Sequence, residues 1–268
     1  MTIPIFVPSR SRSHRIGTII ELQPVIDRVT LVCPCSQTDE YRDAMREQGL
    51  VLPQIEGVPD EWRIGETRLY CGNRAKELGQ SRFGMIDDDI GFLVRKSDDA
   101  WNLRALEPDE VSGMLDFIES YMDDHPAVCL MGISPREGNN NAGDCGDRYK
   151  LIDVGTRIHR TYFWDTAEFL SLHHLRITVA EDFALALESL RRGSLNALTY
   201  WYAQGQRTTQ DEGGASDYRS LEVHNASVRR LAELFPEFVQ VVEQRKKGSH
   251  ALANRLESRI AWKRAAGL

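Results

Sequence analysis

The chain has 268 residues, of which 41% are hydrophobic and 8% aromatic. This length and composition suit one large domain with a substantial core and exclude a disordered chain. No apolar run approaches the ~20 residues that a membrane-spanning helix needs, and residues 1–7 lack the basic start of a signal peptide. We therefore expect a soluble, cytoplasmic protein without a membrane partner. The five cysteines show no CxxC spacing, which argues against a disulfide framework or a structural zinc site.

The formal net charge of −7 is unevenly distributed. Residues 244–268 contain seven basic side chains and one acidic side chain, so this tail carries +6 and the remainder −13. A basic end on an acidic body suggests contact with a polyanion. We expect two parts, a domain over 1–243 and a basic helical tail over 244–268.

In the first third of the chain, short apolar runs alternate with helical patterns. The predicted strands are 3–8, 28–33, 51–55 and 83–86, and the predicted helices are 16–22, 39–48 and 67–78. Such alternation predicts an α/β fold with a mostly parallel sheet.

The rest of the chain is more varied. It contains predicted helices at 109–122, 181–192, 217–234 and 249–265, predicted strands at 127–133, 151–154, 156–163 and 195–202, and polar, Gly-rich loops at 135–148 and 204–216. The last helix is predicted from Leu252, Leu256 and Ile260, which are spaced by four residues.

Three consecutive carboxylates, Asp87 to Asp89, stand between the apolar runs 83–86 and 90–94. Unpaired buried charge is costly, and a divalent cation would offset that cost. Oxygen-rich sites suit Mg²⁺ or Mn²⁺, often with substrate phosphates completing the coordination. Open α/β folds place their sites at strand ends, which favours a metal site over a solvated acidic turn.

Other segments carry candidate functional residues. Residues 8–13 follow the first strand and combine serines with arginines, which suits a phosphate or nucleotide, although exposed loops often have the same composition. Arg68 opens a helix and could pair with Asp87 or Asp88. Glu181 and Asp182 start another helix, as dipole-complementing acids or as a general base. His224 could supply a nitrogen ligand to the ion, although most isolated histidines are not ligands.

In order along the chain, these motifs are 3–12 (IPIFVPSRSR), 65–68 (GETR), 85–89 (MIDDD), 181–182 (ED), 213–214 (GG) and His224. The sequence resembles nucleotide-sugar glycosyltransferases of the GT-A fold. Within them it is most similar to the bacteriophage TET-associated glycosyltransferases, which modify 5-hydroxymethylcytosine in DNA. The resemblance covers about residues 3–240. If the protein is phage-encoded, its expected location is the host cytoplasm.

The resemblance implies a role for each motif residue. Donor-binding residues would be Pro8, Ser9, Arg10, Arg12, Thr67, Arg68, Asp87 and Asp88, with the arginines on the diphosphate or base and the aspartates on the ribose and sugar. Asp89 and His224, with Asp87, would hold Mn²⁺ or Mg²⁺. Asp182 would be the catalytic base and Glu181 the alternate. The donor would be a UDP-sugar.

The acceptor and the type of activity stay open at this level. The leading hypothesis is transfer to 5-hydroxymethylcytosine in DNA, with the basic tail contacting phosphates. A flipped base would need a stacking partner, for which Trp201, Tyr202 and Trp262 are candidates, although packing in the core or against the last helix is the simpler explanation for each of them. The alternatives are a protein or glycan acceptor, and a nucleotide-binding accessory protein without turnover. The sugar, the stereochemistry and the oligomeric state are not predicted.

Overall fold

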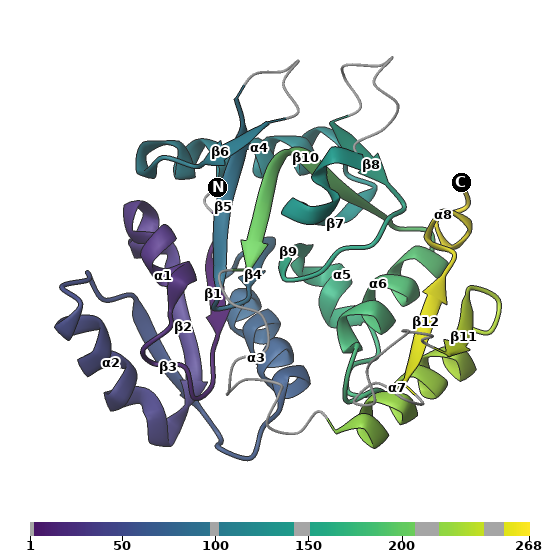
Figure 1. Cartoon of the computed structure of the whole chain (residues 1–268), viewed down its shortest axis with the longest axis horizontal. Helices are drawn as coiled ribbons and strands as arrows, with labels where there is room; N and C mark the ends of the chain where they lie inside the picture. Colours follow the sequence, from purple (N-terminus) through teal and green to yellow (C-terminus); the bar gives the residue numbers. More distant parts are fainter. Residues whose placement is uncertain (1–2, 97–101, 142–150, 207–219, 244–254) are drawn as a thin grey trace, which may run out of the picture.

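The structure, a computed structural model, describes residues 3–96, 102–141, 151–206, 220–243 and 255–268 (Figure 1). Ten strands of these ranges form one large sheet, in the order β3-β2-β1-β4-β9-β7-β10-β5-β6, with β8 paired to β10. The strands are β1 (Ile5–Pro8), β2 (Val29–Pro34), β3 (Gln54–Val58), β4 (Arg82–Ile86), β5 (Ile90–Arg95), β6 (Leu103–Ala105), β7 (Val128–Pro135), β8 (Ile152–Val154), β9 (Thr161–Asp165) and β10 (Leu195–Gln206).

The sheet is parallel in the part that carries the predicted motifs. Strands β3, β2, β1 and β4 lie side by side and run in one direction, and β7 is parallel to β10. Strand β9 enters between β4 and β7 with the opposite direction, and β5, β6 and β8 also pair antiparallel. The predicted α/β class is confirmed, and antiparallel strands complete the sheet.

Helices cover both faces of the sheet because each presents an apolar side to it. Helices α1 (Gly17–Glu21), α2 (Thr38–Glu47) and α4 (Val111–Asp124) contribute to one buried cluster, and α3 (Ile64–Glu77), α5 (Thr166–Ser171) and α6 (Glu181–Arg191) to another. Short 3-10 helices are η1 (Gln23–Arg28), η2 (Cys35–Gln37), η3 (Pro108–Glu110) and η4 (Arg136–Asn141). Within the described ranges, every helix is too short or too polar to cross a bilayer.

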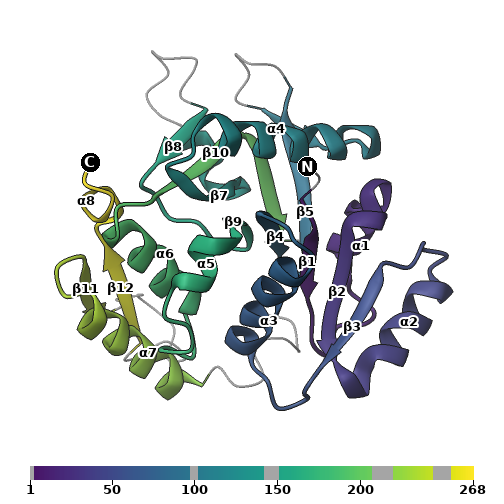
Figure 2. The same ribbon diagram turned by 180° about the vertical axis from the view of Figure 1, so that it is seen from behind.

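The end of the chain differs from the prediction. Helix α7 (Leu221–Leu234) is followed by the antiparallel hairpin of β11 (Val239–Glu243) and β12 (Leu256–Ile260), and then by the short helix α8 (Trp262–Ala265). These elements pack with α6 around a third buried cluster, at the end of the molecule opposite α2 in both views (Figures 1 and 2).

The helix predicted over 249–265 is therefore wrong for Leu256–Ile260, which form β12, whereas the short α8 at its end is helical. Residues four apart share a face in a strand as well as in a helix, so the spacing of Leu256 and Ile260 fits both. The two strands of the hairpin also lie on opposite sides of the predicted boundary at residue 243. Residues 244–254 of the tail, which include Leu252, lie outside the described ranges.

Two further boundaries differ near the predicted site. The strand expected from residue 156 begins only at Thr161, because Gly155 and Arg160 have left-handed backbones (φ 69° and 67°) that a strand does not accommodate. The loop expected from residue 204 starts later, since β10 continues to Gln206. Residues 207–219, which contain the Gly213–Gly214 pair, lie outside the described ranges.

Candidate active site

Strands β1 and β4 are parallel neighbours, so the segments that follow them meet at one edge of the sheet. Arg12 Nη1 donates to Asp88 Oδ1 (2.8 Å) and to Asp89 Oδ2 (3.3 Å), and Ser9 Oγ donates to Asp88 Oδ2. Only 4% of the Asp88 surface is exposed. Burial raises the pKa of Asp88, against the opposing charge of Arg12. The N-terminal Ser-Arg segment and the aspartates thus form one cluster, as the motifs predict.

A buried tyrosine on α2 completes this cluster. Tyr41 Oη accepts a hydrogen bond from the Arg12 main-chain N–H (3.1 Å) and lies 2.6 Å from Ser9 Oγ. Because Ser9 donates its proton to Asp88, Tyr41 must donate to Ser9. Burial raises the pKa of Tyr41, which keeps this donor protonated. Sequence reasoning missed Tyr41, since nothing in the pattern of α2 separates it from a core residue.

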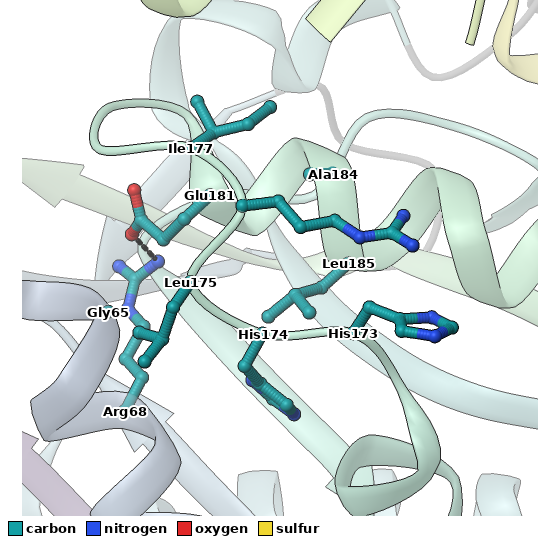
Figure 3. Close-up of a pocket in the computed structure, with 10 residues that line it drawn as sticks. Gly65, Arg68, His173, His174, Leu175, Ile177, Glu181, Ala184 and Leu185 are labelled. Carbon is teal, nitrogen blue, oxygen red and sulfur yellow. Dashed lines mark hydrogen bonds and ion pairs between the residues drawn. The ribbon is translucent and has the colours of Figure 1, made fainter. Parts of the chain in front are cut away.

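Arg68 connects the aspartates to the start of α6, and Figure 3 shows its contact with Glu181. Its guanidinium donates to Glu181 Oε1 (2.6 Å) and to Asp87 Oδ1 (3.4 Å), and it stacks over the ring of Tyr162 at 4.7 Å. Burial alone would lower the pKa of Arg68, but the neighbouring acids hold it well above its ordinary value. The predicted pairing with Asp87 is confirmed, and the partner Glu181 comes from a segment 113 residues away.

Asp87 is the most exposed of the three aspartates, with 35% of its side-chain surface accessible. Burial of its carboxylate and the charges of Asp89 and Asp88 raise its pKa to about 7, against the opposing charge of Arg68. Asp89 is buried and accepts a hydrogen bond from Gln206 Nε2 (2.7 Å) as well as from Arg12.

The carboxylates suit a hard divalent cation. Two carboxylates at strand ends, Asp87 and Asp89, provide the oxygen donors that Mg²⁺ and Mn²⁺ use together with substrate phosphates. Within the described ranges, no three His, Cys, Asp or Glu side chains are grouped closely enough to hold a metal by themselves. Asp87 and Asp89 therefore fit a cation whose coordination a diphosphate would complete.

The structure does not bring His224 to the aspartates. His224 lies in the first turn of α7, and its Nε2 donates to the main-chain oxygen of Leu256 in β12 (2.8 Å). This bond ties α7 to the C-terminal hairpin. The predicted metal-binding set therefore loses its nitrogen ligand in this arrangement.

The two candidate bases at the start of α6 have different partners. Glu181 is 9% exposed and is ion-paired with Arg68. Asp182 Oδ2 accepts a hydrogen bond from the hydroxyl of Tyr162 in β9 (2.8 Å). The pKa of Tyr162 is raised well above its ordinary value by burial and by Asp182, so the hydroxyl remains a donor. Tyr162 thus touches Arg68 with its ring and Asp182 with its hydroxyl, a link that sequence reasoning missed.

Strained backbone surrounds this site. In the described ranges, the non-glycine residues with positive φ are Ser11, Arg160, Leu175 and Ala180. Ala180 (φ 65°) directly precedes Glu181, and Arg160 (φ 67°) accepts a hydrogen bond on its carbonyl oxygen from the Asp87 N–H. Left-handed backbone costs roughly 1–2 kcal/mol per residue, and such strain is typical of functional sites.

Three of the predicted donor-binding residues, Pro8, Arg10 and Thr67, have structural roles in the fold. Pro8 ends β1, Arg10 Nη2 donates to the main-chain oxygens of Asp60 (2.7 Å) and Trp62 (2.6 Å), and Thr67 Oγ1 donates to the oxygen of Arg63 (3.0 Å). The bonds of Arg10 hold the segment after β3 beside the segment after β1.

A pocket opens between the start of α3, the start of α6 and the segment that joins α5 to α6 (Figure 3). Its lining residues are Gly65, Arg68, His173, His174, Leu175, Arg176, Ile177, Glu181, Ala184 and Leu185. The joining segment is held by Glu188, a 2% exposed carboxylate on α6 that pairs with His173 and with Arg176 (3.5 Å). The ion pair of Arg68 and Glu181 therefore borders both this pocket and Asp87.

The three aromatic residues proposed for base stacking pack against other side chains. Tyr202 is buried and contacts Phe117 edge-on (5.7 Å), and Trp201 is partly buried against the same cluster. Trp262 contacts Phe183 edge-on (5.7 Å). Their packing fits the core role that the sequence left open.

Comparison with known proteins identifies a family and a shared fold. A model of the TET-associated glycosyltransferase family matches residues 3–215. No curated protein sequence matches the chain. Among solved structures, TarS residues 1–349 of S. aureus, in complex with UDP, has a TM-score of 0.52 and 14% identity, covering 88% of this chain. The chain spans 65% of that TarS chain.

A glucose-1-phosphate thymidylyltransferase of Bacillus anthracis resembles the chain more weakly. Its TM-score is 0.44 at 10% identity, over 87% of this chain and 95% of that one. The TarS likeness shows a shared fold, and the predicted GT-A type is confirmed.

Proposed function

Because the chain belongs to the TET-associated glycosyltransferase family, we propose that it transfers a sugar from a UDP-sugar to the hydroxyl of 5-hydroxymethylcytosine in DNA. The observation that carries this proposal is the convergence of Asp87–Asp89 and Glu181–Asp182 through Arg68. One end of this arrangement suits a diphosphate and its cation, and the other end suits a hydroxyl nucleophile. The family name supports the DNA acceptor, and the UDP-bound TarS structure supports UDP as the carrier.

On the donor side, Asp87 and Asp89 would hold Mn²⁺ or Mg²⁺, and Asp88 would contact the nucleotide. The cation supplies positive charge against the charge that grows on the departing diphosphate. Arg12 donates to Asp88, and Tyr41 accepts from the Arg12 main chain, so Asp88 has a fixed orientation. Rigid side chains of this kind bind a donor without first having to be ordered.

On the acceptor side, Asp182 is the stronger candidate for the base. Glu181 is committed to Arg68 at 2.6 Å, and protonating it would break a buried ion pair. Asp182 accepts the Tyr162 hydrogen bond through Oδ2 and has a second carboxylate oxygen for a substrate hydroxyl. A carboxylate there can take the acceptor proton as the new glycosidic bond forms.

The test is incubation of the protein with hydroxymethylcytosine DNA and a panel of UDP-sugars, followed by nucleoside mass spectrometry. We expect a hexosylated nucleoside with Mn²⁺ or Mg²⁺, and none with unmodified cytosine DNA. Transfer to a protein or glycan, with none to DNA, would assign a different acceptor. If the protein binds UDP but transfers sugar to none of these acceptors, it is a nucleotide-binding accessory protein without turnover.

Two variants test the assigned roles. Asp89→Ala should abolish transfer in a folded protein, and excess chelator should reproduce this loss in the wild type, because the diphosphate loses its counter-charge. Asp182→Asn keeps the shape but removes the basicity, so turnover should fall steeply with little change in donor affinity. Full activity in excess chelator would rule out a role for the metal. If Glu181→Gln is inactive while Asp182→Asn keeps its activity, the catalytic base is Glu181 and not Asp182.

A further inference from the structure

The segment 157–160, between β8 and β9, lies beside both halves of the candidate active site. The Asp87 N–H donates to the carbonyl oxygen of Arg160 (2.9 Å), and Gln204 Nε2 in β10 donates to that of His159 (2.7 Å). The left-handed backbone of Arg160 ends the segment directly before β9. The segment is thus fixed to the large sheet, so its side chains have defined positions rather than those of a free loop.

His159, within this segment, is influenced by charged side chains of both signs. Burial lowers the pKa of His159 to about 4, with further lowering by the charges of Arg157 and Arg160 and an opposing effect of Asp182. His159 is therefore neutral at pH 7. Two guanidinium groups, those of Arg157 and Arg160, and the carboxylate of Asp182 are the charges that act on it.

The cations of this segment differ from those around the aspartates. Arg12 and Arg68 are ion-paired with carboxylates, whereas the buried Arg160 Nη1 has no hydrogen-bond partner in the described part of the chain. The same holds for the buried Nδ1 of His159. Buried polar groups are nearly always paired, and no carboxylate of the described residues pairs with Arg160, so its guanidinium can still accept an anion as partner.

Arg157, the other arginine of this segment, packs against α6. Its guanidinium stacks over the ring of Phe183 at 4.8 Å, and Phe183 directly follows Asp182. An arginine held on an aromatic face keeps its N–H groups available for an anion and loses little freedom when it binds one. Arg157, Arg160 and the proposed base Asp182 all act electrostatically on His159, so the three side chains lie in one neighbourhood.

We propose that Arg157, His159 and Arg160 bind a backbone phosphate of the acceptor DNA next to the nucleotide that receives the sugar. The inference rests on the proposed function and extends it by naming the group that positions the acceptor. A phosphodiester carries a single negative charge and accepts hydrogen bonds from guanidinium and imidazole N–H groups. The contact is independent of base sequence.

The test compares the double variant Arg157→Gln/Arg160→Gln with the wild type. A fluorophore-labelled duplex containing one 5-hydroxymethylcytosine is titrated at several salt concentrations, and UDP affinity is measured by calorimetry. We expect DNA affinity at low salt to fall about tenfold, and the slope of log K against log salt to become shallower by about 1 for each phosphate that the variant no longer binds. UDP affinity should change less than about twofold.

The matched control is Arg191→Gln. Arg191 also stacks over an aromatic ring, that of Phe235 at 4.9 Å, but lies at the other end of α6. It should leave both affinities unchanged. If the double variant unfolds, Arg157→Glu, which alters a more exposed position, provides the same comparison and should weaken DNA binding further than Arg157→Gln.

An unchanged salt slope in the folded variants would overturn the inference, as would a loss of UDP affinity with DNA binding intact, which would place these cations on the donor diphosphate. If the wild type transfers sugar to DNA and the salt slope of the double variant is unchanged, the inference is wrong and the proposed function is supported. A reduced slope without any sugar transfer to DNA would support the phosphate contact and contradict the proposed function. A wild type that does not bind DNA overturns both.

Discussion

At the residue scale, the hydroxyl of Tyr162 is the contact that most directly positions the proposed base. Tyr162→Phe removes one oxygen, and with it the 2.8 Å bond to Asp182 Oδ2, while the ring that carries Arg68 remains. We expect kcat to fall about tenfold with donor KM unchanged, since the carboxylate is less well oriented toward the acceptor. Steady-state kinetics in both substrates measures this.

Tyr70→Phe is the control for this prediction. The Tyr70 hydroxyl donates to Glu56 in β3 at the same distance of 2.8 Å, away from α6. It should leave kcat within about twofold of the wild type. Equal losses in the two variants would mean that Tyr162 only supports the fold.

The buried His159 predicts a pH dependence of stability. Its pKa is about 4 in the folded protein and near 6.5 in the unfolded chain, so the unfolded state binds more protons between these values. Stability therefore falls as the pH drops from about 7 towards 4, by about 2 kcal/mol at pH 5 from this group alone. Thermal unfolding of His159→Gln should show a smaller drop between pH 7 and pH 5. The variant His14→Gln, at an exposed position, should show the same drop in stability as the wild type. If the stability of His159→Gln depends on pH as steeply as that of the wild type, the prediction is wrong.

Residue-level contacts were predictable only where the motif and the strand order coincide. The pairing of Arg68 with Asp87 follows from a helix start and a strand end that meet at one sheet edge. Tyr41, Tyr162 and Gln206 lie within elements whose apolar pattern explains them as ordinary core or strand residues. Their contacts depend on which strands are neighbours, and β9 lies between β4 and β7 although it follows both in the chain.

At the element scale, sequence patterns predict elements well where only one periodicity fits. Strand β4, helix α3 and helix α6 are found within three residues of their predicted ends. The prediction for the C-terminal segment fails because Leu256 and Ile260 satisfy both periods, and because cross-strand partners in β11 stabilise a strand that local pattern does not reveal. The prediction for His224 fails for the same reason, since its partner Leu256 belongs to that strand.

The hairpin of β11 and β12 can be tested by alanine substitutions at one buried and one exposed position. Leu256 is 9% exposed and packs in β12, whereas Val241 in β11 is 36% exposed. Leu256→Ala should cost about 2 kcal/mol of unfolding free energy, and Val241→Ala less than about 0.5 kcal/mol. Urea denaturation measures both. Similar losses at both positions would argue against this hairpin.

At the scale of the whole molecule, the question is which cations meet the DNA. The charge count of the sequence favours the tail, but two of its described cations are already engaged: Arg255 pairs with Glu257 (2.9 Å), and Lys263 pairs with Asp153. These bonds tie the tail to its own hairpin and to β8. A basic segment of the sequence suggests that a polyanion binds there, while the location of unpaired charge depends on ion pairs that only the fold brings together.

The last prediction separates these two surfaces. Arg255→Gln/Arg259→Gln/Lys263→Gln removes three tail charges and leaves Leu256 and Ile260 in place. If acceptor phosphate binds at Arg157 and Arg160, the salt slope of DNA binding should stay within about 0.5 of the wild-type value, because neutralising groups that release no counterions leaves the slope unchanged. Fluorescence anisotropy at several salt concentrations gives the slope, with unfolding midpoints as the control for folding. A slope shallower by about 2 or more would show that DNA lies across the C-terminal hairpin, beside α6, and would restore the basic tail as the phosphate-binding surface.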